Sequence, residues 1–424
     1  MTDLVVVGLG YVGLTSAVGL ASLGHKVIGI DTNETTVAKL NSGQVPIYEP
    51  GLEDLMQNLL SNGNLSFYDS YEKILDSSEI AFVCVPTPSL SDGNANLAFV
   101  ESAIESLASK LTPGSIVVIK STVPIGTSLK FASDLQKFGI DICSNPEFLQ
   151  EGSALYDFEN PSRIVVGGES QNVSKKVMDL YEKVEAPRLY CNLTSAETIK
   201  HASNAFLALK LSFVNELASL CEITGARMSE VKLGLSLDPR IGDKFLDAGP
   251  GWGGSCFPKD TSELAHTSRS LGWKMLTVES AIESNKRAMQ KVCLDLFENL
   301  KDGVSGKKIA VWGLAFKANT DDTRDSPAMT IIDILLEEGA VVTAFDPLAK
   351  PKTDGKFGLA ESAIDACIGA HALLVLTEAT EFRHISPSEA ASAMAANALV
   401  FDTRRVLERE VWLKHFEGVK TLGN

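Results

Sequence analysis

Cys256 differs from the other cysteines of the chain in the residues around it. The preceding segment, GPGWGGS at 249–255, is rich in glycine and proline, and Lys259 and Asp260 follow within four residues. Glycine and proline shape tight loops, and a thiol held on such a loop can attack a bound electrophile. The alternative is a small apolar residue beside a turn. We expect the other cysteines, which are scattered and form no CxxC pair, to be buried small hydrophobic residues.

Three other short segments carry candidates for chemistry. Glu147 and Glu151 stand four residues apart in NPEFLQEG, and Thr122 follows an apolar run in IKSTVPIGT. Lys200 and Asn204 fall on one face of an expected helix, a pattern that equally suits a solvated face. The six histidines occupy no glycine-rich or acidic segment. We therefore expect them at surface or structural positions, and not as the base that alcohol oxidation needs.

A glycine turn near the N-terminus indicates a dinucleotide site. Gly8, Gly10 and Gly13 form GxGxxG directly after an expected strand and before an expected helix, and Asp31 closes the next strand. In this context the backbone approaches a pyrophosphate at a helix N-terminus. Asp31 would accept hydrogen bonds from the ribose hydroxyls and repel a 2′-phosphate, so NAD is favoured over NADP. The alternative is a Rossmann-type domain that binds no nicotinamide.

An α/β block and a long helix must position these residues. Short apolar strands alternate with helical patterns to about residue 190, which predicts a parallel sheet buried on both faces. Residues 194–224 contain neither proline nor glycine and predict a connecting helix of about 30 residues. Thr194 or Ser195 would cap it, with Glu197 in the first turn.

A second α/β block begins near Lys307. Its helix should start at Ser326 and Pro327 and end at Gly339. The expected fold class is therefore α/β, with two Rossmann-like doubly wound domains joined by a long central helix. The expected divisions are a cofactor domain at 1–193, a helical dimerisation region with the cysteine loop at 194–300, and a C-terminal sugar-nucleotide domain at 301–424.

Length and composition limit the partners. A chain of 424 residues predicts two or three domains, and it contains no run of 18 apolar residues that would indicate a membrane span. A net charge of −16 argues against nucleic acid or an anionic membrane surface as partner. No His/Cys cluster has metal-ligand spacing. The strand-like start DLVVVG and the odd number of cysteines predict no signal peptide and reduced thiols in the cytoplasm.

Longer motifs make the resemblance to a known family specific. The chain resembles the UDP-glucose/GDP-mannose dehydrogenase family over nearly its whole length, through segments that occur in the same order: GLGYVGL, PIYEPGL, IKSTVPIGT, NPEFLQEGSALYDF, IKHASNAFLA, DPRIG, GPGWGGSCFPKD and GLAFKANTDDTRDSP. Serine at position 255, where the N-acetylmannosamine branch usually carries histidine, is similar to the members that act on UDP-glucose at C6.

This resemblance implies a four-electron oxidation. A C6 alcohol would become an aldehyde and then an acid, with two NAD used in turn. Cys256 would attack the aldehyde carbon to form a thiohemiacetal, and a second hydride transfer would give a thioester that water hydrolyses. The cysteine would therefore be a nucleophile.

The resemblance also implies roles for the residues around the thiol. Lys200 would stabilise oxyanions that form at C6, and Asn204 would position the reacting oxygen. Asp260 would act with a water as the base in the first oxidation and tune the charge of Lys200. Thr122 would hold that water, and Glu147 would assist thioester hydrolysis.

Binding residues follow from the same resemblance. Those expected at the cofactor are Gly8, Gly10, Tyr11, Val12, Gly13, Asp31, Thr87, Thr122, Glu151 and Arg324. Those expected at the substrate are Phe148, Leu149, Glu151, Lys200, Asn204, Arg240, Phe245, Gly253, Phe316, Lys317 and Arg404. Arg240 would reach the sugar nucleotide of a neighbouring subunit, in a homodimer or higher homo-oligomer built on the long helix. Arg324 would stand near the cofactor and the cleft between the domains.

Two departures leave the sugar open. Family members often carry tryptophan where this chain has Ala379, and glycine where it has Thr403. The alternative substrates are GDP-mannose, UDP-N-acetyl sugars or UDP-galactose. A two-electron hydroxyacid dehydrogenase of related architecture would need no cysteine. A sugar-nucleotide sensor without catalysis would need neither the thiol nor the charged residues named beside it.

Overall fold

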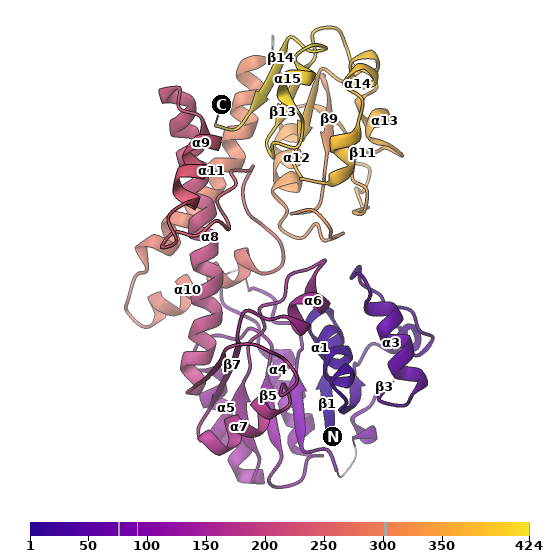
Figure 1. Ribbon diagram of the computed structural model, residues 1–424, viewed down its shortest axis with the longest axis vertical. Coiled ribbons are helices and arrows are strands. Elements are labelled where there is room, and N and C mark those ends of the chain that lie inside the picture. The colour runs from indigo at the N-terminus through magenta and orange to yellow at the C-terminus, as the bar shows by residue number, and fades with distance from the viewer. Residues whose placement is uncertain (75–76, 91, 301–302, 424) are drawn as a thin grey trace. The chain divides into compact units, whose positions relative to one another are not determined.

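The computed structural model describes residues 1–74, 77–90, 92–300 and 303–423 (Figure 1). The chain forms two compact units. The first consists of Met1–Ser203 with Ser262–Trp273, and the second of Asn204–Thr261 with Lys274–Asn424. Each unit is a sheet with helices on both faces, which confirms the expected fold class of two Rossmann-like domains and a long central helix. The three-part division by residue number stays a prediction.

The sheet of the first unit has the order β3-β2-β1-β4-β5-β6-β7-β8 among the described strands. These are β1 (Asp3–Val7), β2 (Lys26–Ile30), β3 (Leu65–Tyr68), β4 (Ile80–Val83), β5 (Ile116–Ile119), β6 (Asp141–Ser144), β7 (Ile164–Gly168) and β8 (Arg188–Cys191). Successive side chains of a strand point to opposite faces. Leu4 and Val6 of β1 therefore enter one hydrophobic core, and Val5 and Val7 enter the other.

Helices cover both faces of this sheet. The helices packed on the Leu4 and Val6 face are α1 (Tyr11–Ser22), α2 (Glu34–Asn41), α3 (Leu52–Ser61), α6 (Ala154–Glu159) and α7 (Gln171–Asp179). Those on the opposite face are α4 (Ala98–Ala108) and α5 (Thr127–Leu135). Because both faces are covered, the central strands are continuous apolar runs, as the sequence predicted.

The far edge of this sheet differs from the all-parallel prediction. Strand β7 pairs antiparallel with β6, with Cys143 opposite Gly168. Antiparallel neighbours need no crossover helix on the opposite face, and α6 is a short element between them. Strand β8 follows in parallel, and its side chains are largely exposed, so it is not buried on both faces.

Helix α8 (Leu193–Thr224) has 32 residues and begins in the first unit and ends in the second. Its length agrees with the prediction, but the predicted cap was wrong. The helix starts at Leu193, and the side chain of Asn192 accepts a hydrogen bond from the Ser195 amide at 2.7 Å. Glu197 consequently lies beyond the first turn, where it is available to another element.

The second unit is built on a smaller parallel sheet. Among the described strands its order is β11-β10-β9-β12-β13-β14, with β9 (Lys308–Trp312), β10 (Val341–Phe345), β11 (Gly358–Leu359), β12 (Ala372–Val375), β13 (Leu399–Asp402) and β14 (Gly418–Thr421). Its helices are α9 (Met228–Ser236), α11 (Leu276–Asn299), α12 (Pro327–Glu337), α13 (Ala363–Cys367), α14 (Pro387–Ala393) and α15 (Arg409–Trp412). Ser326 caps α12 by accepting from the Ala328 amide, as predicted.

The strand orders identify where each unit can bind a ligand. In an open α/β sheet, ligands bind beyond the carboxyl ends of the strands where the order reverses. The reversal lies between β1 and β4 in the first unit, and between β9 and β12 in the second. The glycine turn follows β1, and the segment with Phe316 and Lys317 follows β9. Among the described residues, no helix is both long and apolar enough to cross a membrane.

Candidate active site

The glycine turn after β1 has the close packing of a dinucleotide-binding turn. Gly8 has a φ of 87°, and a Cβ on it would lie 2.9 Å from the Cys84 carbonyl. A Cβ on Gly13 would lie 1.7 Å from the Gly8 oxygen, so this helix turn tolerates no side chain. A Cβ on Gly10 would meet nothing within 4 Å. The backbone at Gly10 therefore faces open space, as the approach of a pyrophosphate requires.

Asp31 is held at the end of β2 by two backbone amides. Its carboxylate accepts hydrogen bonds from the Leu9 amide at 2.8 Å and the Asn33 amide at 2.9 Å. The group is only partly buried, and each carboxylate oxygen can accept more than one bond. Asp31 can therefore still accept bonds from a ribose diol.

A buried carboxylate that the sequence did not single out ties this turn to a second segment. The Tyr11 hydroxyl donates to Glu49, and the Gly152 amide donates to the Tyr11 oxygen at 2.6 Å and to Glu49 at 3.0 Å. Burial, and then the bond to Glu49, raise the pKa of Tyr11. Val12 packs against the adjoining core, and Glu151 precedes Gly152 as a half-buried side chain. The cofactor turn is thus fixed to the NPEFLQEG segment.

Lys200 and Glu147 form a buried ion pair in the first unit. Their nitrogen and oxygen atoms lie 2.7 Å apart, and the side chains are 4% and 6% exposed. The other Glu147 oxygen accepts from the Leu149 amide at 2.6 Å. A carboxylate neighbour favours the charged ammonium, which burial alone would disfavour. The sequence had suggested a solvated face as the alternative for Lys200, and its burial excludes that alternative.

A cavity of about 190 Å³ adjoins this ion pair. Glu147, Phe148 and Leu149 line it, together with the buried Lys120 and with Arg163, whose guanidinium lies 3.6 Å from the centre of the Phe148 ring. Burial lowers the pKa of Lys120, which donates to the Asn145 side chain at 3.1 Å. Lys120 and Arg163 therefore contact the first and last residues of the NPEF segment, Asn145 and Phe148.

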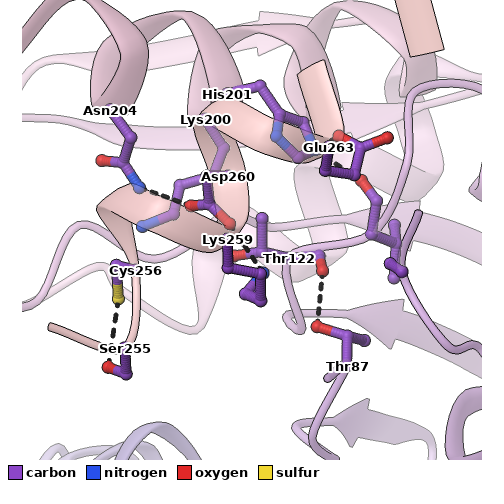
Figure 2. Close-up of polar contacts among 12 residues, drawn as sticks. Thr87, Thr122, Lys200, His201, Asn204, Ser255, Cys256, Lys259, Asp260 and Glu263 are labelled. Carbon is purple, nitrogen blue, oxygen red and sulfur yellow. Dashed lines mark hydrogen bonds and ion pairs between the residues drawn. The ribbon is translucent and has the colours of Figure 1, made fainter. Parts of the chain in front are cut away.

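In the second unit, Cys256 lies directly before helix α10 (Phe257–Ser270). The Asp260 amide donates to the Cys256 carbonyl at 2.9 Å, so the cysteine occupies the capping position of the helix. Its thiol is half-buried, 3.6 Å from the Ser255 hydroxyl (Figure 2). The positive end of a helix dipole favours a thiolate, which is the nucleophilic form. The assignment of Cys256 as a nucleophile stays a prediction.

Asp260 is held between an amide and an ammonium. Asn204 donates to one carboxylate oxygen at 2.5 Å and Lys259 to the other at 2.6 Å, and Figure 2 shows both contacts. The Asp260 side chain is 1% exposed, while that of Lys259 is 20% exposed. A neighbouring ammonium keeps a buried carboxylate charged. Asp260 is thus a buried, doubly hydrogen-bonded carboxyl group one helical turn after the thiol.

The glycines before Cys256 are required by close packing within the second unit. A Cβ on Gly253 would lie 2.0 Å from the Asp325 carbonyl oxygen. Gly254 has a φ of 84°, and its Cβ would lie 2.8 Å from the Phe316 ring. A Cβ on Gly249 would lie 2.8 Å from the Arg404 guanidinium. The cysteine loop therefore runs against the carboxyl edge of the C-terminal sheet.

That edge carries the residues expected to bind the sugar nucleotide. Arg404 donates to the Leu376 carbonyl at 3.0 Å and the Phe316 carbonyl at 3.3 Å, and it pairs with Glu378 at 3.3 Å. The Lys317 ammonium lies 5.8 Å from the centre of the Phe316 ring. These cations lie at the reversal of the strand order, where a nucleotide phosphate would be expected.

Phe245 belongs to the same unit, with its ring 6.2 Å from that of Phe257 at the start of α10. Arg240 and Arg324 are different: each is exposed and bonds the aspartate two residues before it. Neither exposed arginine is brought to the cysteine loop by these contacts, so their assigned roles stay predictions. Thr403 stands where glycine was expected and donates to the Val375 carbonyl at 2.7 Å. This bond makes the threonine a fixed part of the sheet edge.

Sequence reasoning missed a second buried pair near the NPEF turn. His201 and Glu263 approach to 3.1 Å, and their side chains are 1% and 2% exposed. His201 follows Lys200 directly, and Glu263 follows Asp260 by three residues. That spacing on two helices was the available signal. Histidine was expected at surface or structural positions, and His201 is a buried one.

The cysteines agree with the sequence prediction in most cases. Cys84, Cys143, Cys221, Cys293 and Cys367 are buried, whereas Cys191 is half-buried, and each is a free thiol. Burial raises the pKa of Cys293 to about 12, and desolvation is likewise the largest cause for the others whose pKa is raised. Among the described residues, no group of three histidine, cysteine, aspartate or glutamate side chains could hold a metal ion.

The glycine turn suits the pyrophosphate of a dinucleotide, and the Asp31 carboxylate suits its ribose. With the second nucleotide-binding edge in the C-terminal sheet, these features define an NAD-dependent dehydrogenase. The chain belongs to the UDP-glucose/GDP-mannose dehydrogenase family. Residues 2–185 match its NAD binding domain, 194–287 its central domain and 310–409 its UDP binding domain. The resemblance seen in the motifs is thereby confirmed, as is NAD as cofactor.

Individual relatives extend this similarity along the chain. A UDP-glucose 6-dehydrogenase of Rhizobium meliloti (strain 1021) is 39% identical over 423 residues, which is 96% of both chains. A solved UDP-glucose dehydrogenase of Pyrobaculum islandicum superposes with a TM-score of 0.91 at 36% identity, covering 100% of this chain and 98% of that one. A UDP-D-ManNAc dehydrogenase of Pyrococcus horikoshii gives 0.90 at 28% identity, covering 100% and 99%.

The unequal space around the glycines gives a matched pair of variants. Gly13→Ala should lower the free energy of unfolding by about 1–3 kcal/mol, because its Cβ meets backbone. Gly10→Ala should leave that free energy within about 0.5 kcal/mol and weaken NADH binding. Urea unfolding and NADH fluorescence titration measure the two effects. Wild-type NADH affinity in Gly10→Ala would contradict a pyrophosphate at this turn.

Proposed function

We propose that this dehydrogenase oxidises the C6 alcohol of UDP-glucose to the carboxylate of UDP-glucuronate, through a thioester on Cys256. The observation that carries the proposal is the position of Cys256: it caps α10, one turn before the buried carboxylate of Asp260, on a loop packed against the UDP-binding edge. A two-electron hydroxyacid dehydrogenase would need no such thiol. The names of relatives at about 39% identity support UDP-glucose as the sugar nucleotide.

The first oxidation needs a base and a stabilised oxyanion. Asp260 takes the hydroxyl proton through a water that Thr122 holds, and Asn204 keeps the reacting oxygen in place. The Lys200 ammonium, kept charged by Glu147, stabilises the alkoxide that forms. The glycine turn and Asp31 would hold NAD, which would supply the hydride acceptor for each of the two oxidations.

The second oxidation needs the thiol. The Cys256 thiolate attacks the aldehyde carbon, and the role proposed for the Lys200 ammonium is to stabilise the oxyanion of the resulting thiohemiacetal. Loss of hydride from C6 leaves a thioester. Water then adds to the thioester carbonyl with help from Glu147, and the carboxylate leaves as the thiolate is restored. Overall one water is consumed, two hydrides leave C6 and three protons are released.

The sugar nucleotide and cofactor contacts complete the proposal. Phe316, Lys317 and Arg404 would hold the UDP portion, since two cations and an aromatic ring suit a nucleoside diphosphate. The proposed contacts of the sugar side are Phe148, Leu149, Glu151, Phe245, Gly253 and, from a neighbouring subunit, Arg240. The proposed cofactor contacts beyond the glycine turn and Asp31 are Thr87, Glu151 and Arg324.

A homodimer built on the long helix is part of the proposal. Phe206, Phe213 and Leu220 recur every seven residues along α8 and are exposed, as are Leu233 of α9 and Leu237 directly after it. Exposed apolar side chains in such a stripe are typical of a helix that packs on a partner. A second copy of this chain would cover them and would bring Arg240 to its neighbour's substrate.

The reaction is tested first by its stoichiometry. With UDP-glucose limiting and NAD in excess, we expect two NADH per sugar, followed by absorbance at completion. One NADH per sugar would contradict the thioester route. No NADH from UDP-glucose would reject this sugar, and the same assay with GDP-mannose, UDP-N-acetylmannosamine and UDP-galactose would then identify the substrate.

The nucleophile is tested by Cys256→Ser, with Cys191→Ser as the matched control at another half-buried thiol. Cys256→Ser should bind NADH normally and release acid about a thousandfold more slowly, because losing a catalytic nucleophile costs at least that much. Cys191→Ser should keep the wild-type rate. Full turnover in Cys256→Ser would show that another group attacks the aldehyde.

The dimer is tested by placing a charge in the stripe. Phe213→Glu should give a monomer by light scattering, because a carboxylate in an apolar interface is costly to desolvate. Phe138→Glu, at an exposed phenylalanine of the first unit, is the control and should leave the mass unchanged. A monomeric wild-type protein would contradict the proposed assembly.

A further inference from the structure

The turn between β5 and α5, residues 121–126, is held in place by side chains of other elements. The Thr87 hydroxyl donates to the Thr122 carbonyl at 2.8 Å. His201 Nε2 donates to the next carbonyl, that of Val123, also at 2.8 Å. Two consecutive carbonyls are therefore held by two side chains distant in sequence. Thr122 sits on this turn, so these bonds set where its hydroxyl can lie.

Helix α8 holds the turn at both ends. Glu197 accepts hydrogen bonds from the Gly126 amide at 2.6 Å and the Ser128 amide at 2.7 Å. His201 follows Glu197 by one helical turn and donates a hydrogen bond to the Val123 carbonyl. Lys200 lies on the same stretch of the helix, because residues three and four apart share a face. A single helix face thus fixes the Thr122 turn and carries the ammonium of the Glu147–Lys200 pair.

The carboxylate of Glu263, on α10, lies against the His201 ring. A backbone carbonyl can only accept, so the bond to Val123 requires a proton on Nε2 of the histidine. Glu263 Oε2 lies 3.1 Å from this nitrogen, and Oε1 accepts from the Thr267 hydroxyl at 2.6 Å. Figure 2 shows the ring and the carboxylate facing each other. Glu263 Oε2 accepts no hydrogen bond from the ring, whose Nε2–H is used by Val123, so the carboxylate acts on the imidazole through its charge and its packing.

Burial makes this arrangement costly. A carboxylate and an imidazole removed from water lose hydration that apolar side chains of the same size would not need. Glu263 also lies one turn after Asp260 along α10, and His201 lies beside Lys200 along α8. This desolvation cost is incurred beside Lys200 and Asp260, where a displacement of Thr122 would affect the proposed reaction most.

We propose that His201 and Glu263 are positioning residues that fix Thr122 for the oxidation of the alcohol. This rests on the proposed function, in which Thr122 holds the water that carries the alcohol proton to the base. Neither residue touches the substrate in this role. The oxidation of the aldehyde proceeds through the thiol and does not use that water. Disturbing the pair should therefore slow the first oxidation and spare the second.

The decisive comparison is between two substitutions at one position. His201→Phe fills the space without a donor, whereas His201→Gln places an amide N–H close to where Nε2 lies. With UDP-glucose, His201→Phe should lower kcat about tenfold to a hundredfold, as small misplacements near reacting groups do, with little change in KM. His201→Gln should recover most of that loss. A primary isotope effect with C6-deuterated sugar should be larger in His201→Phe than in the wild type.

The aldehyde provides the step-specific control. Given the UDP-hexodialdose as substrate, His201→Phe should form NADH and acid within about twofold of the wild-type rate. His25→Phe is the matched variant, because His25 Nε2 makes the same kind of bond to the Leu180 carbonyl at 3.0 Å. It should leave both rates unchanged. Equal losses on alcohol and aldehyde, or equal rates for His201→Phe and His201→Gln, would overturn the proposal.

Glu263→Gln keeps the side-chain shape and decides the matter even if His201→Phe fails to fold. We expect a slower alcohol oxidation and an unchanged aldehyde rate, because the amide removes the charge that faces the His201 ring. A wild-type alcohol rate in Glu263→Gln would contradict the pairing. If the wild-type enzyme oxidises another sugar nucleotide, the same comparison is made with that alcohol and its aldehyde. A wild-type enzyme that oxidises none of them would refute both proposals.

Discussion

The ammonium group of Lys200 is almost wholly removed from water, and the packing around it in the first unit depends on its ion pair. Glu147 lies 2.7 Å from the Lys200 nitrogen, and such a buried pair is stabilising only when its geometry is well fixed. Two contacts fix this geometry. The Leu149 amide donates to the second oxygen of Glu147, and the Arg163 guanidinium stacks on the Phe148 ring. The NPEF turn and the start of α8 are therefore one rigid piece.

Close approach of backbone is the second constraint, and it recurs at both sheets. Gly13 lets α1 contact the turn after β1, and Gly253 and Gly254 let the cysteine loop contact the segment after β9. In each unit the glycines stand at the carboxyl edge where the strand order reverses. Any larger residue would move the loop away from the place where a nucleotide binds. The same physical need explains two motifs that share no sequence.

Local rules explain which parts of the fold the sequence predicted. The GxGxxG turn, the caps of α12 and the length of α8 depend on residues adjacent in sequence, and all three agree with the structure. The start of α8 was missed because Asn192 competes with Thr194 and Ser195, which propensity ranks alike. The antiparallel β7 and the His201–Glu263 pair depend on which elements meet in space. Motif matching supplied the candidate catalytic residues, whereas Glu49 and Glu263 required coordinates.

The boundary between the two compact units cuts through α8 between Ser203 and Asn204, and through α10 between Thr261 and Ser262. Lys200 and Asn204 are one turn apart on a continuous helix, yet they belong to different units. The halves of this enzyme are consequently not interchangeable modules. A chimera joined at either boundary would place the junction inside a helix that carries reacting groups. Recombination between relatives has better crossover points before Asn192, which caps α8, so that the whole of α8 is inherited intact with its cap.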